Sequence, residues 1–133
     1  MAESGKKVLI ADDEADVHAF VEAVLEEDGH QVVGAMDGEA AIAMVKAENP
    51  DLVILDVQMP KKDGFEVFNQ LRRDDATKSI PIIMLTAVSK RTGIPFSARD
   101  MGEFYDSEPE AFIDKPIDPE TLRAVANKLL GIS

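Results

Sequence analysis

Five reactive side chains stand at or just beyond the ends of short apolar runs, and together they could bind and transfer a phosphoryl group. They are Asp12, Asp13, Asp56, Thr86 and Lys115. Carboxylates from two runs suit a hard cation such as Mg²⁺, which takes oxygen ligands and shares its shell with water and phosphate oxygens. Acids crowded together also repel one another unless a cation neutralises them. We therefore treat Asp12, Asp13 and Asp56 as candidate metal ligands.

The other two side chains suit the opposite side of a phosphoryl group. The Lys115 ammonium would pair with one oxygen and the Thr86 hydroxyl would hydrogen-bond another. A carboxylate can also be the nucleophile and form an aspartyl-phosphate; Asp56 is the best candidate, because it stands alone after a central apolar run. Taken singly, Asp12 and Asp13 indicate a solvated loop or helix cap, Lys115 a surface lysine and Thr86 a strand-end hydroxyl. The prediction of a phosphoryl-transfer site therefore depends on all five residues occurring together.

The apolar runs that carry these side chains are predicted to be β-strands. Each is short and rich in Val, Ile and Leu, as expected for strands that helices cover on both faces. A weaker run reads as a further strand, second in the chain. The predicted strands are residues 8–11, 31–35, 52–55, 82–85 and 111–113.

Segments with apolar residues at helical spacing separate most of these strands. The separating segments are residues 17–25 (closed by Gly29), 39–47 and about 65–73, and a further helical segment, about 119–130, follows the last strand. Strands alternating with helices predict βαβ units, a parallel sheet and right-handed crossovers. The carboxyl ends of the strands then lie along one edge, where open α/β sheets bind their ligands.

Length and composition predict a single cytoplasmic domain. The chain has 133 residues, 45% of them hydrophobic, which is enough for one sizeable core. It has no cysteine, no apolar stretch of membrane-spanning length and no signal-peptide pattern. Because the final predicted helix ends near residue 130, we expect no output domain. The net charge of −12 argues against contact with nucleic acid and favours partners that carry a basic patch.

The ordered set of motifs resembles the receiver domain of bacterial response regulators, the phosphoacceptor modules of two-component systems. The resemblance runs from about Lys7 to Leu130 and rests on Asp12-Asp13, Asp56 followed by Met59-Pro60 and Asp63-Gly64, Thr86-Ala87, and Lys115-Pro116. It implies a doubly wound, flavodoxin-like α/β fold with a five-stranded parallel sheet in the order 2-1-3-4-5. It also implies phosphotransfer to Asp56 from a histidine kinase or a histidine phosphotransfer protein.

The resemblance further implies how the metal would be held. Mg²⁺ would bind Asp13, Asp56 and the backbone carbonyl of Gln58, with Asp12 assisting through water. The remaining implied roles concern the phosphoryl group and its readout: Thr86 and Lys115 would contact it, Phe112 would be an aromatic switch that follows Thr86, and the Lys115–Pro116 peptide bond would be cis.

Residues 87–110 follow no regular pattern, although a short helix starting near Pro95 is the expected element there. The stretch from Thr86 to Lys115 is longer than usual for the family. In the proteins that this chain resembles, the positions two residues after the acceptor and two after the threonine tune how readily water attacks the acyl phosphate. Here the second of these is Val88, which has no polar group to orient that water, so we expect slow self-dephosphorylation. The aromatic residues of this part of the chain would cover a satellite core or dock a partner; they are Phe96, Phe104, Tyr105 and Phe112. We expect His18 and His30 to lie on the surface.

Three functional hypotheses follow. The first is a stand-alone response regulator that signals through an unidentified protein target, in the manner of chemotaxis regulators or phosphorelay intermediates. The second is a receiver-like interaction module that is never phosphorylated. The third is an aspartyl-phosphate phosphohydrolase, which is disfavoured because such enzymes place a second acid two residues after the nucleophile, where this chain has Gln58.

Overall fold

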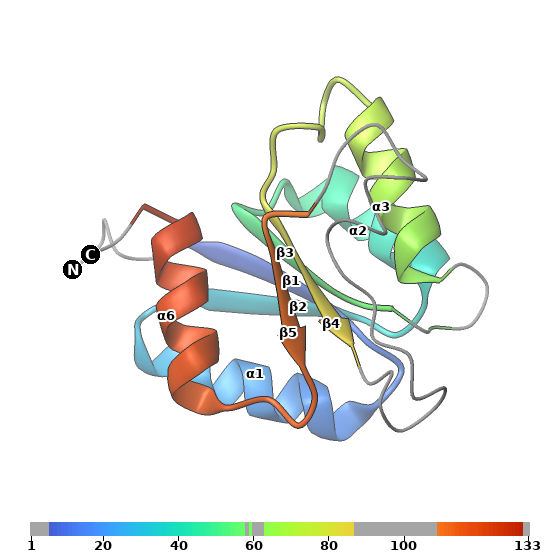
Figure 1. The fold of residues 1–133 in the computed structure, drawn as a ribbon. Helices are drawn as coiled ribbons and strands as arrows, with labels where there is room; N and C mark the ends of the chain where they lie inside the picture. Colours follow the sequence, from blue (N-terminus) through green and yellow to red (C-terminus); the bar gives the residue numbers. More distant parts are fainter. Residues whose placement is uncertain (1–5, 58, 60–62, 87–108, 132–133) are drawn as a thin grey trace.

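The computed structural model describes residues 6–57, 59, 63–86 and 109–131 (Figure 1). The described elements follow one another as strands and helices in near-regular alternation. In chain order they are β1 (Lys7–Ala11), α1 (Ala15–Glu27), β2 (Gln31–Ala35), α2 (Gly38–Glu48), β3 (Leu52–Asp56), α3 (Gly64–Arg73), β4 (Ile82–Thr86), β5 (Ala111–Asp114) and α6 (Pro119–Leu129).

The strands form one parallel sheet in the order β2-β1-β3-β4-β5, which confirms the predicted fold class and topology. The helices α1 and α6 cover one face of the sheet, and α2 and α3 cover the other (Figure 1). Consecutive strand residues point to opposite faces. The central strands β3 and β4 are consequently buried along their whole length.

Each face of the sheet packs its own hydrophobic cluster. On the α2–α3 face, the fully buried Phe68 of α3 packs with Leu9, Leu55 and Met84 from three strands. On the α1–α6 face, the cluster joins α1 and α6 to the alternate residues of the same strands; its buried members include Ile10, Ile54, Leu85, Leu25 and Leu122. The alternation anchors every strand from both sides, so the strand ends are held in register.

Helix starts are fixed by side-chain caps at three of the four helices in the described chain. Asp37 caps α2 through the Ala40 amide, and Asp118 caps α6 through the Thr121 amide. Asp63 and Glu66 form a reciprocal capping box at the start of α3. Gly29 follows α1 with φ of 88°, the left-handed conformation predicted for it from sequence. None of the described helices is long and apolar enough to cross a membrane.

The expectation that His30 lies on the surface is wrong. Its side chain is buried, with 4% of its surface exposed. Nε2 lies 3.0 Å from Oδ1 of Asn127 in α6, and Nδ1 accepts from the Lys6 amide at 3.3 Å. These partners, distant in sequence, provide hydrogen bonds to both ring nitrogens of the buried His30. The local sequence around residue 30 does not indicate them.

Candidate functional site

Three acidic side chains converge where β1 and β3 end, at the carboxyl edge of the sheet. One carboxylate oxygen from each of Asp12, Asp13 and Asp56 lies within 4.8 Å of the others. Asp12 and Asp56 are buried, whereas Asp13 is exposed. The parallel pairing of β1 with β3 places Ala11 opposite Leu55, so the residues that follow these two emerge side by side. The fold thus brings together the three carboxylates that the sequence singled out.

Asp12 lies in the loop between β1 and α1, where two hydrogen bonds hold it. Its amide donates to the carbonyl of Ala35 at 3.1 Å, and its Oδ1 accepts from the Glu14 amide at 2.9 Å. Its Oδ2 is buried and lies beside the ammonium of Lys115, 2.9 Å away. A buried carboxylate is costly unless a positive charge accompanies it. The donor set, three carboxylates that lie close together, fits a small oxygen-seeking cation such as Mg²⁺.

Lys115 supplies a positive charge to this acidic cluster. Its Nζ lies 2.9 Å from Oδ2 of Asp12, 3.1 Å from Oε1 of Glu14 and 3.3 Å from Oδ1 of Asp56. Burial opposes the charge on Lys115, but the carboxylates of Asp12 and Asp56 outweigh it and raise its pKa. The ammonium is therefore permanently charged at neutral pH and lies directly beside the proposed nucleophile.

The surroundings of Asp56 strongly disfavour its ionised form. Burial, reinforced by the negative charge of Asp12, raises its pKa to about 6, although Lys115 acts in the opposite direction. At neutral pH the group is ionised and poorly hydrated. A desolvated carboxylate with an elevated pKa is a better nucleophile than an ordinary surface aspartate, and such perturbed groups concentrate at functional sites.

Thr86 ends β4 and is buried, with 2% of its surface exposed. Its hydroxyl donates to Oδ1 of Asp114, the last residue of β5, at 2.5 Å. The pairing of the two strands places these residues directly opposite each other. The structure therefore gives the Thr86 hydroxyl a carboxylate partner that was not anticipated from sequence, although both residues are polar strand ends.

The resemblance also implied a cis peptide bond before Pro116 and a switch role for Phe112, and the structure describes both residues. The Lys115–Pro116 peptide bond is cis, the isomer that the resemblance implies. Phe112 is half-buried and packs against the α2–α3 cluster. Gln58, Val88, Phe96, Phe104 and Tyr105 lie outside the described residues.

A histidine that sequence reasoning did not place at the site contacts its backbone. Nε2 of His18 in α1 lies 2.7 Å from the carbonyl oxygen of Asp12, which can only accept, so the ring donates. The ring fits against β2 because residue 34 is glycine; a Cβ there would overlap the imidazole. His18 and Gly34 thus help to fix the loop that carries Asp12 and Asp13.

A second close approach lies behind Asp56. Gly64 begins α3, and its amide donates to the carbonyl of Val57 at 2.8 Å. A Cβ at residue 64 would overlap the backbone carbonyl oxygen of Asp56. The glycine therefore lets α3 start against the strand end that presents the candidate nucleophile.

We expect Gly64→Ala to lower the free energy of unfolding by about 1–2 kcal/mol, measured by urea denaturation. The helix-propensity gain of alanine, up to about 1 kcal/mol, is outweighed by an overpacking cost of about 1–3 kcal/mol. Gly34→Ala is the comparison variant: its added carbon meets the His18 side chain and not backbone, so the ring can rotate away at the cost of its hydrogen bond to Asp12, and we expect a smaller loss. A Gly64→Ala variant as stable as the parent would show that the close approach is unimportant.

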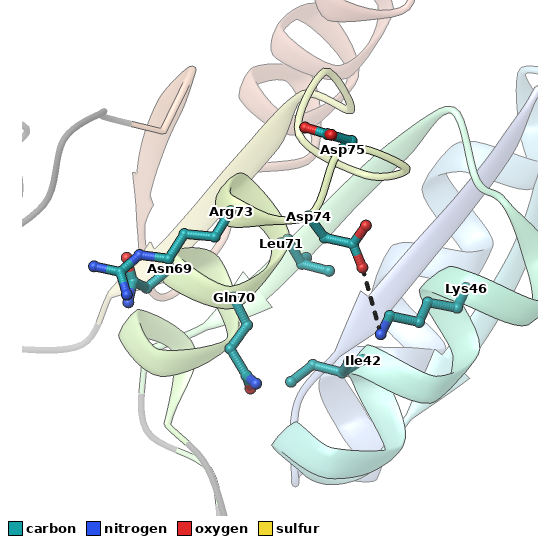
Figure 2. Close-up of a pocket in the computed structure, with 8 residues that line it drawn as sticks. All are labelled: Ile42, Lys46, Asn69, Gln70, Leu71, Arg73, Asp74 and Asp75. Atoms are coloured by element: carbon teal, nitrogen blue, oxygen red, sulfur yellow. Dashed lines mark ion pairs between the residues drawn. The ribbon is translucent and has the colours of Figure 1, made fainter.

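A separate surface groove lies between α2 and α3 (Figure 2). Lys46 of α2 and Asp74, just after α3, form an ion pair of 3.4 Å across it. Ile42 and Gln70 also line it. Asp74 stands between the end of α3 and the amino end of β4, whereas the acidic cluster lies at the carboxyl edge of the sheet. None of the acidic cluster lines it, so it is not part of the candidate site.

Comparison with known proteins identifies relatives over most of the chain. A family model described as the response regulator receiver domain matches residues 8–127. The chain is 34% identical over 125 residues to protein PilH of Pseudomonas aeruginosa, covering 94% of this chain and 98% of that protein. It is 38% identical over 129 residues to "Probable transcriptional regulator ycf27" of Porphyridium aerugineum, covering 94% of this chain and 48% of that protein.

The chain spans about half the length of several curated relatives that it matches. Among solved structures, the chemotaxis response regulator CheY4 of Vibrio cholerae superposes with a TM-score of 0.75 at 30% identity, covering 93% of this chain and 98% of that one. The arrangement of strands, acids and lysine thus occurs on a fold shared with known signalling proteins.

Proposed function

Because the chain belongs to the response regulator receiver domain family of two-component signalling, we propose that it is a phosphoacceptor switch. A histidine kinase or a histidine phosphotransfer protein donates a phosphoryl group to Asp56 in a Mg²⁺-dependent reaction. The phosphorylated protein then signals by altered contacts with a protein target. The proposed setting is the cytoplasm, the compartment typical of the family.

One observation carries this proposal: a desolvated carboxylate, Asp56, lies beside an ammonium and within 4.8 Å of oxygens from two further acids. Its pKa of about 6 leaves it ionised at neutral pH. Lys115 lies 3.3 Å from it, and Asp12 and Asp13 complete the acidic cluster. An interaction module that was never phosphorylated would have no use for a buried arrangement of like charges, which is costly to maintain.

In the proposed reaction, an oxygen of Asp56 forms a bond to phosphorus while the phosphorus–nitrogen bond of the donor phosphohistidine breaks. The donor imidazole keeps the electron pair and takes a proton from solvent. The product is a mixed anhydride, the aspartyl-phosphate. Asp56 serves as a nucleophile throughout and needs no proton transfer of its own, since it is already ionised.

The surrounding residues compensate the charge that arrives with the phosphoryl group. Lys115 pairs with a phosphoryl oxygen in place of part of its contact with Asp12 and Asp56. When bound, Mg²⁺ would be held by Asp13, Asp56 and the backbone carbonyl of Gln58, with Asp12 assisting through water, and would neutralise these acids and the phosphoryl oxygens. Thr86 donates its hydroxyl to another phosphoryl oxygen, and Phe112 follows the movement of Thr86.

The chain is proposed to catalyse its own phosphorylation and slow dephosphorylation without acting as a multiple-turnover enzyme. Val88, two residues after Thr86, offers no polar group to orient water. The net charge of −12 weighs against direct binding of nucleic acid by this domain and favours partner proteins with basic docking surfaces.

The proposed function is tested by incubating the protein with a small-molecule phosphodonor, with Mg²⁺ or with a chelator. We expect one phosphoryl group per chain, formed only with Mg²⁺ and released slowly once the donor is removed. Continuous phosphate release over many turnovers would instead indicate a phosphohydrolase. An absence of labelling would indicate an interaction module and would contradict the proposal.

A further inference from the structure

The hydrogen bond between Thr86 and Asp114 occupies the same hydroxyl that the proposed function needs. Oγ1 of Thr86 donates to Oδ1 of Asp114 at 2.5 Å. A second bond fastens the same pair of strand ends, because the Lys115 amide donates to the Thr86 carbonyl at 2.7 Å. Thr86 is buried and Asp114 is exposed. The acceptor is therefore at the surface, whereas the donor is shielded from solvent.

A threonine hydroxyl has one proton and can donate to one acceptor at a time. A carboxylate is a strong acceptor, since charge-assisted hydrogen bonds are shorter and about twice as strong as neutral ones. A phosphoryl oxygen on Asp56 is an acceptor of the same kind, one strand away, because β3 and β4 are neighbours. Asp114 and the phosphoryl group therefore compete for one donor.

Phe112 lies next to the residues that take part in this competition. Side chains two residues apart on a strand point to the same face, so Thr86 lies beside Met84 on β4, and Asp114 lies beside Phe112 on β5. In the β4–β5 pairing, Met84 is opposite Phe112 and Thr86 is opposite Asp114. The four side chains form one patch, and a change of partner by Thr86 occurs next to the half-buried aromatic ring.

We propose that Asp114 is a positioning residue that retains Thr86 in the resting conformation and so sets how strongly the phosphorylated site drives the switch. The inference rests on the proposed function, because it needs a phosphoryl group as the competing acceptor. Breaking the Thr86–Asp114 bond is then a fixed cost of activation. A chain without that carboxylate reaches the active conformation more readily.

The test measures binding of beryllofluoride, a non-covalent mimic of the phosphoryl group, in the presence of Mg²⁺ by titration calorimetry. We expect Asp114→Ala to raise the apparent affinity about tenfold, since no hydrogen bond to a charged acceptor must be broken. Asp114→Asn, which keeps a neutral acceptor, is expected to give a smaller increase. In the free protein, the NMR rotamer populations of Thr86 should shift in Asp114→Ala, which loss of a surface charge alone does not explain.

A double-mutant cycle separates the hydrogen bond from the charge of Asp114. In a Thr86→Ala background, Asp114→Ala should leave beryllofluoride affinity unchanged, because no hydroxyl remains to be released. The inference is overturned if Asp114→Ala binds like the parent, or if its gain persists undiminished in the Thr86→Ala background. Failure of the parent protein to bind beryllofluoride with Mg²⁺ would instead reject the proposed function and, with it, this inference.

Discussion

Asp56→Asn is expected to lose all measurable phosphoryl labelling and, at the same time, to become more stable than the parent near neutral pH. The amide cannot act as the nucleophile, so no aspartyl-phosphate forms. The stability gain has a separate cause. Burial and the charge of Asp12 raise the pKa of Asp56 to about 6 from a usual value of 3.8. The ionised form is therefore disfavoured in the folded state, and the neutral amide removes that penalty.

Because the pKa of Asp56 is raised in the folded state, the stability gain of Asp56→Asn depends on pH. Above the folded-state pKa of about 6, Asp56 is charged in both the folded and the unfolded chain, and its full penalty is present. As pH falls towards 3.8, the folded chain binds the proton first and the penalty disappears. We expect Asp56→Asn to raise the free energy of unfolding by about 2 kcal/mol at about pH 7.5. The gain is limited because the substitution also removes one of the carboxylates that balance the charge of Lys115.

Urea denaturation with a chelator present, at about pH 7.5 and about pH 4.5, checks this prediction. The gain should shrink strongly at the lower pH. Adding Mg²⁺ should stabilise the parent more than the variant, because the variant has lost one carboxylate ligand. A stability difference independent of pH would contradict the assignment of the penalty to the Asp56 charge.

Lys115→Met is expected to lower the free energy of unfolding by about 3 kcal/mol in the absence of divalent cations. Lys115 is within 3.3 Å of both buried carboxylates, Asp12 and Asp56. Without Lys115, the negative charges of Asp12 and Asp56 remain close together, and no other cation of the described residues contacts them. Part of the loss is offset because Asp56 takes up a proton more readily, so the deficit should be smaller at low pH.

Because the deficit is electrostatic, Mg²⁺ should recover most of it by replacing the missing positive charge. Labelling by a small phosphodonor should still fall strongly, since no ammonium remains to pair with the phosphoryl oxygen. Lys128→Met, at an exposed lysine of α6, is the matched control and should change stability by less than about 1 kcal/mol. Unchanged stability of Lys115→Met in chelator would refute the charge-compensating role of Lys115.

Sequence pattern was sufficient to predict the sheet and the acidic cluster. Strands such as β3 and β4 are continuous apolar runs, and a parallel sheet has only one edge at which their carboxyl ends can lie. Asp12 and Asp56 follow two of those runs, so their proximity required no knowledge of side-chain contacts. Helix starts can likewise be predicted from local sequence, because a capping aspartate such as Asp63 accepts a hydrogen bond from an amide only three residues further on.

Contacts between polar residues distant in sequence were not predictable in the same way. Thr86 and Asp114 meet because β4 and β5 pair in one register, and no local pattern specifies that register. His30 is buried because Asn127, far along the chain, provides a partner. His18 reaches the Asp12 carbonyl only because residue 34 lacks a Cβ. In each case tertiary packing selects the partner, whereas the local sequence shows only a polar side chain.

The central claim, that Asp56 accepts the phosphoryl group, is tested most directly by locating the modification on the chain. The protein is treated with a small phosphodonor and Mg²⁺, reduced with borohydride, which converts an aspartyl-phosphate to homoserine, and mapped by peptide mass spectrometry. We expect homoserine at position 56 and at no other aspartate. Homoserine at Asp12 or Asp13 instead, or none at position 56 under conditions that label the intact protein, would contradict it.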